Sequence, residues 1–142
     1  MTDMKEIAIY IVIIFIALLA AQHLNVVVSG SMEPVFYRGD IVAVEKANLF
    51  GLGIQEFDPE DVNVGDIVVY NAEWVNEPVI HRVINITEIN GTTYYEIKGD
   101  NNNAPDPYYV HPSQITDKVI MMGDNPVVIP YIGNINLWLK GL

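Results

Sequence analysis

The chain has 142 residues, of which 18 are acidic and 7 are basic, so its formal net charge is −11 at pH 7, and it contains no cysteine. Disulfides, thiolate metal sites and cysteine nucleophiles are therefore excluded. The acidic balance argues against a nucleic-acid partner, because a phosphate backbone is bound by a basic face. The 51% share of hydrophobic residues argues against intrinsic disorder.

A long apolar run begins near the N-terminus. Residues Ile7–Ala21 carry no polar side-chain atom except the Tyr10 hydroxyl, and the run continues to Leu24 with two polar residues near its end. A helix needs roughly 20 residues to cross the hydrocarbon core of a bilayer. The run is therefore at the short end of a membrane span.

A cleaved signal peptide is the alternative interpretation of this run. Cleavage requires small residues two positions apart, and the alanines of the run offer no such pair. A cut after Ser31 would interrupt the most distinctive motif of the chain. We therefore expect residues 1–25 to form a retained membrane anchor and residues 26–142 to form one domain. Lys5 and the α-amino group weakly favour a cytoplasmic N-terminus and an extracytoplasmic domain.

Beyond the anchor the sequence is typical of β-structure. Short β-branched or aromatic runs alternate with Gly, Pro, Asn and Asp, and they predict strands at residues 26–28, 41–45, 66–70, 79–86, 93–97, 119–122 and 127–129. Asn90-Gly91 lies between two of these runs and predicts a hairpin. We expect a mainly β, mostly antiparallel, barrel-like domain, closed or nearly closed, behind a transmembrane helix.

The first of three polar stretches reads S-G-S-M-E-P at residues 29–34 and R-G-D at residues 38–40. Small residues around Ser31 would let a substrate backbone approach it closely. Ser31 follows the apolar run by about seven residues, which extend over roughly 23 Å at most. Taken alone, Ser31 is more simply explained as part of a polar loop that leaves a helix.

The second stretch reads G-D-I-V-V-Y at residues 65–70 and P-V-I-H-R-V-I at residues 78–84. Strand alternation places Val79, His81 and Val83 on one face. A histidine on an apolar face is unfavourable unless its nitrogens are paired. His81 is therefore either a hydrogen-bonded core residue, which this segment alone favours, or a base that faces a cleft.

The third stretch, K-G-D-N-N-N-A-P-D at residues 98–106, holds two carboxylates, Asp100 and Asp106. Alone, it is better explained as a solvated turn, because Asn and Asp bond their own backbone. The three stretches together provide a serine, a histidine 50 residues later and aspartates beyond it. These are the residue types of a nucleophile, a base and an orienting acid.

The order of these motifs, with P-Y-I-G at residues 130–133 as a fourth piece, resembles the signal peptidase I family (peptidase family S26) in its archaeal and endoplasmic-reticulum branch. Bacterial-type members use a lysine base where this chain has His81. The resemblance implies that Ser31 is the nucleophile, His81 the general base and Asp106 the triad aspartate.

The same resemblance makes Asp100 a supporting aspartate, and it assigns the Ser29 hydroxyl, with the Ser31 amide, to an oxyanion hole. Asp106 stands alone before Pro107, where many relatives have an acidic pair. Both aspartates therefore remain candidates to face His81.

The resemblance implies a membrane-bound serine endopeptidase, without a cofactor, that removes signal peptides by cutting after small side chains. Its expected partners are secretory pre-proteins, membrane lipid and the protein-translocation machinery. We also expect a second membrane contact from the apolar C-terminal end, residues Ile135, Leu137, Trp138, Leu139 and Leu142.

Three alternatives stay open. One is an autoproteolytic relative of the same fold, against which the anchor argues. Another is a metal site built from His81, Asp100, Asp106 and His111, although their spacing matches no helical zinc motif. The last is an inactive or purely binding, membrane-tethered β domain.

Overall fold

The computed structural model describes residues 3–130. Within that range the one α-helix is α1 (Met4–Gln22), and two short 3-10 turns are η1 (Pro59–Asp61) and η2 (Pro112–Gln114). The strands are β1 (Leu24–Val26), β2 (Ile41–Lys46), β3 (Ile67–Asn71), β4 (Pro78–Ile89), β5 (Thr92–Lys98), β6 (Ile115–Val119), β7 (Met121–Met122), β8 (Asn125–Pro126) and β9 (Val128–Ile129). The P-Y-I-G motif, apart from its first residue, and the expected C-terminal membrane contact lie outside the described residues.

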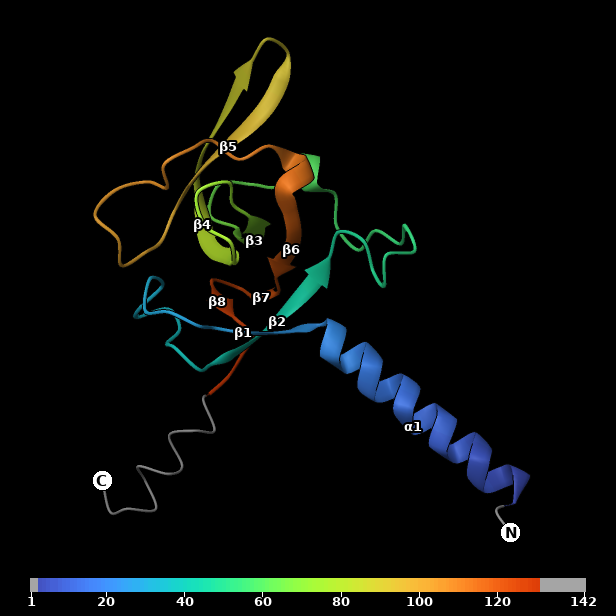
Figure 1. Ribbon diagram of the computed structural model, residues 1–142. Helices are drawn as coiled ribbons and strands as arrows, with labels where there is room; N and C mark the ends of the chain where they lie inside the picture. Colours follow the sequence, from blue (N-terminus) through green and yellow to red (C-terminus); the bar gives the residue numbers. More distant parts are fainter. Residues whose placement is uncertain (1–2, 131–142) are drawn as a thin grey trace, which may run out of the picture.

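Helix α1 extends away from the β-domain (Figure 1). It is apolar on all sides, and none of its residues is buried. By length and composition it can cross a membrane, and it is the one such helix among residues 3–130. A helix that is apolar all round is normally covered, by protein or by lipid, and here protein does not cover it.

The main sheet has the strand order β1-β2-β6-β3-β4-β5, and β9 also pairs with β2. All of its ladders are antiparallel, which confirms the predicted fold class. The predicted hairpin is present as well, since β4 and β5 are joined by Asn90 and Gly91, both with positive φ. Figure 1 shows this hairpin projecting from the domain.

The expected closure of the barrel is not found: within residues 3–130 no pairing joins β1 to β5. The free edge of β5 is taken by the segment that follows it, residues 99–114, which we call the return segment. The Asp106 amide donates to the Ile97 carbonyl, and Tyr95 and Val110 exchange two backbone bonds. Because the return segment covers this edge, β1 has no edge there to pair with.

The C-terminal strands differ from the prediction. The run expected at residues 119–122 is divided, because Val119 ends β6 and the segment at Met121 and Met122 forms a small hairpin with β8. The beginning of β6 was missed because it carries a charge on its inner face. Asp117 is 4% exposed, and its carboxylate is paired with the Lys46 ammonium at 2.8 Å.

Two hydrophobic clusters hold the domain together. One lies among β3, β4, β5 and the return segment and includes Tyr70, Val83 and Tyr95. The other joins the segment after β1 to β2 and β6 and includes Met32 and Phe36. Burial of each such side chain contributes roughly 1.5–3 kcal/mol. The second cluster fixes the segment that carries Ser31.

A polar contact attaches α1 to the sheet. The His23 Nδ1 lies 2.7 Å from the Leu19 carbonyl oxygen, and Nε2 lies 2.8 Å from the Glu56 carboxylate. Both partners are acceptors, so both ring nitrogens must donate, which only the imidazolium can do. The backbone bond to Leu19, and then the bond to Glu56, raise the pKa of His23 above 6.5.

This geometry predicts how the junction responds to pH. A pKa raised by folding adds stability that is complete below the unfolded value and is lost as pH rises through the folded value. Histidine NMR of the micelle-bound chain should give a His23 midpoint above 6.5. The variant Glu56→Gln should lower that midpoint, whereas the exposed control Glu60→Gln should not. A His23 midpoint at or below 6.5 in the unchanged chain would contradict the geometry.

Candidate active site

Ser31 lies in the loop that joins β1 to β2, which we call the serine loop (residues 27–40). The loop is closed at its base, where the Val27 amide donates to the Asp40 carbonyl and the Gly39 amide donates to the Val27 carbonyl. Met32, immediately after Ser31, is fully buried. The serine is therefore fixed from both sides while its hydroxyl stays accessible.

His81 lies on the buried face of β4, as the alternation predicted. Val79 and Val83 are buried on the same face, and the His81 side chain is 6% exposed. Its Nε2 lies 2.9 Å from the Ser31 Oγ. The strand therefore brings His81 to the serine loop across 50 residues of sequence.

Asp106 lies in the return segment, where its amide bond to the Ile97 carbonyl sets its position. Its carboxylate oxygens lie 2.8 and 2.9 Å from the His81 Nδ1, and its side chain is 3% exposed. A carboxylate only accepts, so Nδ1 carries the proton and Nε2 is free to accept one from Ser31. Ser31, His81 and Asp106 thus form one hydrogen-bonded row.

Asp100 has a different partner. Its carboxylate accepts two bonds from the Arg82 guanidinium, at 2.8 Å and 2.9 Å. Arg82 also donates to the Gly65 carbonyl at 2.8 Å. Of the two aspartates that the sequence left open, Asp106 lies against His81, whereas Asp100 bonds Arg82, which also bonds the turn at Gly65.

Tyr70 also belongs to the site, and sequence reasoning did not single it out. It is fully buried at the end of β3, and its hydroxyl donates to the Asp106 carboxylate at 2.6 Å. Burial, and then the bond to Asp106, raise the pKa of Tyr70, so the hydroxyl stays protonated. The available signal was a tyrosine directly after the apolar run at residues 67–69, because a buried phenol requires a partner.

The G-D-N-N turn packs directly against the serine loop, which sequence reasoning also missed. The Asn101 amide donates to the Ser31 carbonyl at 2.8 Å, and its side chain donates to the Gly30 carbonyl. A Cβ at Gly99 would lie 2.8 Å from the Ser31 carbonyl oxygen and 3.0 Å from the His81 Nε2. Only glycine leaves room for the serine and the histidine at this point.

Ser29 lies beside the nucleophile position. Its Oγ is 3.0 Å from the Ser31 Oγ and 3.5 Å from the Ser31 amide nitrogen. A hollow of about 320 Å³ opens next to this pair and to His81, with Trp74 and Ile80 also in its wall.

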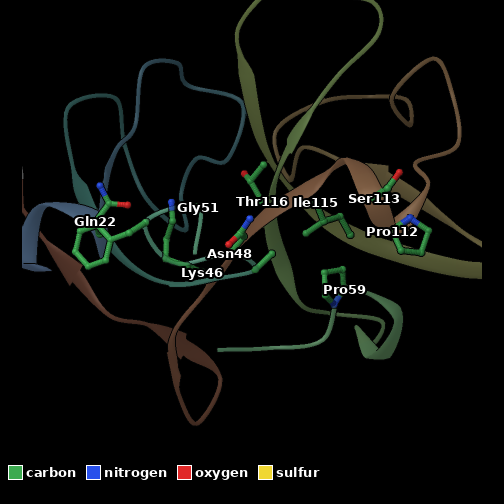
Figure 2. Close-up of a pocket in the computed structure, with 11 residues that line it drawn as sticks. Gln22, Lys46, Asn48, Gly51, Pro59, Pro112, Ser113, Ile115 and Thr116 are labelled. Atoms are coloured by element: carbon green, nitrogen blue, oxygen red, sulfur yellow. The ribbon is translucent and has the colours of Figure 1, made fainter. Parts of the chain in front are cut away.

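A larger hollow of about 650 Å³ contains none of these residues. Figure 2 shows it, with Gln22 and Gly51 on one side and Pro59 and Pro112 on the other. Within residues 3–130, no group of three or more histidine or acidic side chains is placed to hold a metal ion. His111, for example, is bonded to Ser113.

A hydroxyl, an imidazole and a carboxylate in one row, beside a hollow, are the arrangement that serine hydrolases use. The family model described as "Signal peptidase, peptidase S26" matches residues 2–87. The chain belongs to this family.

Individual relatives agree with this assignment. The chain is 36% identical to an uncharacterized protein of Methanocaldococcus jannaschii, over 84% of both chains. It is 32% identical to the signal peptidase complex catalytic subunit SEC11 of Plasmodium falciparum and 34% identical to SEC11C of the dog. These two alignments cover 81% and 79% of this chain but only 57% and 54% of the relatives, so the chain spans little more than half of their length.

The two aspartates are distinguished by replacing each with asparagine. Asp106→Asn should reduce kcat for cleavage of a signal-peptide substrate by up to about 10,000-fold, because an amide supports the wrong histidine tautomer. Asp100→Asn should reduce kcat by a smaller factor, because Asp100 bonds Arg82 rather than His81. Both rates are measured on purified protein of equal thermal stability. A larger loss for Asp100→Asn would exchange the two roles.

Proposed function

We propose that this protein is a membrane-anchored serine endopeptidase that removes signal peptides from secretory pre-proteins. The observation that carries the proposal is the Ser31–His81–Asp106 row in a chain of the signal peptidase family. The names of the SEC11 relatives, which are catalytic subunits of a signal peptidase complex, support it.

The chemistry follows from the row. The Ser31 Oγ attacks the peptide carbonyl carbon while the His81 Nε2 accepts its proton, and His81 then gives that proton to the leaving amine. Water hydrolyses the resulting ester by the same proton transfers. Asp106 keeps the Nδ1 proton in place and stabilises the imidazolium that forms.

The developing oxyanion requires donors. The Ser31 amide and the Ser29 hydroxyl lie on the approach to Ser31 and have only a long, 3.5 Å contact with each other. A substrate oxygen can replace that contact. Each such donor typically contributes about 3 kcal/mol to transition-state stabilisation.

The hollow beside Ser31 supports an extended substrate with small side chains near the cut. It lies between the serine loop and the start of β4. Among the described strands, residues 78–81 of β4 pair with β3 alone, so a peptide could pair with their other edge. Its volume of about 320 Å³ is at the lower end for ligand pockets. Trp74 and Ile80 in its wall would exclude long side chains.

Helix α1 would anchor this site at the membrane, with the N-terminus in the cytoplasm and the β-domain outside. Only residues 23–30 separate the helix from Ser31. The site would then act on pre-proteins as they leave the bilayer or the translocation machinery.

The nucleophile is tested by Ser31→Ala. Incubation of the detergent-solubilised full chain with a pre-protein, followed by mass spectrometry, should locate a cut after a small residue. Ser31→Ala should remove this cleavage and leave thermal unfolding unchanged, because one small loop residue replaces another. The control Ser113→Ala changes a serine outside the row, and this variant should cut the pre-protein at the normal rate. Turnover above a few per cent in purified Ser31→Ala would refute the assignment.

Tyr70 is proposed as a positioning residue that acts through Asp106. Tyr70→Phe should lower kcat without changing KM, because the hydroxyl touches no substrate. It should also move the acid limb of the kcat/KM profile to higher pH, because an Asp106 without this donor binds the imidazolium more strongly.

Tyr95→Phe is the matched control for this variant. Tyr95 is as deeply buried, and its hydroxyl donates to the Pro59 carbonyl at 2.7 Å, away from the row. Its loss should reduce stability by about 1 kcal/mol and leave the acid limb in place. If both variants shifted the limb equally, Tyr70 would have a structural role only.

A further inference from the structure

An uncharged segment interrupts this acidic chain. Residues 47–55, which we call the apolar loop, follow β2 and contain no charged side chain, although the chain carries a net charge of −11. Phe50, Leu52 and Ile54 are 38%, 72% and 50% exposed. These apolar side chains occur at every second residue, and none of them joins either hydrophobic cluster.

The apolar loop has a defined conformation. The Leu49 amide donates to the Ile54 carbonyl at 2.8 Å, and the Gly53 amide donates to the Asn48 side chain at 2.6 Å. Phe50 has a φ of 55°, in the left-handed region that aromatic residues rarely adopt. Because Leu49 is buried and the turn bonds itself, the loop presents its remaining apolar side chains to the outside.

The apolar loop is also attached to the end of α1. Glu56, directly after it, bonds the His23 side chain and the Lys46 amide, each at 2.8 Å. Gln22, the last residue of α1, lines the same large hollow as Phe50 and Gly51 (Figure 2). Figure 1 shows the loop, in blue-green, beside the end of α1 that meets the sheet.

We propose that the apolar loop is a second membrane contact, which inserts Phe50, Leu52 and Ile54 into the bilayer interface next to α1. The proposal rests on the proposed anchoring role of α1, because the end of a membrane span lies at the lipid surface. A loop bonded to that end lies at the same level. Its lack of charge suits the interface, where acidic side chains would be repelled by anionic lipid.

The second contact has a consequence for the active site. A single helix can tilt in the bilayer and carry the attached domain with it, whereas a loop that also inserts limits this tilt. The hollow beside Ser31 would then keep one orientation toward the membrane.

The absence of cysteine makes a site-specific test simple. Leu52→Cys, labelled with an environment-sensitive fluorophore, is placed in the full chain and reconstituted in phosphatidylcholine vesicles that contain lipids with brominated acyl chains. A separate labelled variant, Leu18→Cys, reports whether α1 lies in the bilayer. Ile89→Cys, 42% exposed at the β4–β5 hairpin, is the matched apolar control. We expect bromolipid quenching at positions 18 and 52 and none at position 89.

Each other result has a definite meaning, and none depends on catalysis. Quenching at position 18 but not at 52 would refute the loop contact and leave the anchor in place. A blue-shifted but unquenched label at position 52 would show contact with protein, in the same chain or a second copy, instead of lipid, and would also overturn the proposal. Without quenching at either position, both the anchor and the contact fail.

A second measurement uses activity. The combined variant Phe50→Asn, Leu52→Ser and Ile54→Ser should cut a soluble signal-peptide substrate at the normal rate but a vesicle-bound pre-protein several-fold more slowly. The control variant Ile84→Ser, Ile86→Ser and Ile89→Ser removes three exposed apolar side chains from β4, and its rates relative to the unchanged chain should be the same for both substrates. The quantity compared is the ratio of the vesicle-bound rate to the soluble rate. If this ratio were the same for both variants, the proposal would be contradicted. If the unchanged chain cut neither substrate, the proposed function would be contradicted.

Discussion

The bond between His81 and Asp106 is the interaction on which the rest of the site depends. Both side chains are almost fully buried, and such a pair is favourable only when its remaining polar atoms are also bonded. Tyr70 bonds the carboxylate and Ser31 bonds the imidazole. These bonds therefore join β3, β4, the return segment and the serine loop, and loss of one member leaves a polar atom of its neighbour without that partner.

The open sheet and the site have a common cause. The return segment takes the edge of β5 that a closed barrel would use, and the same backbone bond, from Asp106 to Ile97, delivers the carboxylate to His81. At the start of this segment Gly99 and Asn101 touch the serine loop. One stretch of chain after β5 thus carries Asp106 and also contacts the loop that carries Ser31.

Hydrophobic alternation and turn residues predicted those features of the fold that depend on neighbouring residues in the sequence. The strands, the Asn90-Gly91 hairpin and the buried face of His81 follow from alternation and turn chemistry. The sequence could not show which aspartate meets His81, because that depends on Arg82 holding Asp100, nor that Tyr70 bonds a residue 36 positions away. The start of β6 was missed because the buried Asp117 looks like a surface residue until its bond to Lys46 is known.

The junction at His23 joins these parts to helix α1. The chain leaves α1 through His23, forms β1 and enters the serine loop, so the segment that attaches the helix also leads to Ser31. Val44 of β2 bonds the His23 carbonyl, and Glu56 bonds its imidazole. The helix is therefore joined to the sheet at two points rather than by a free linker. In a rigid junction of this kind, the orientation of the helix determines the orientation of the domain and of the hollow beside Ser31.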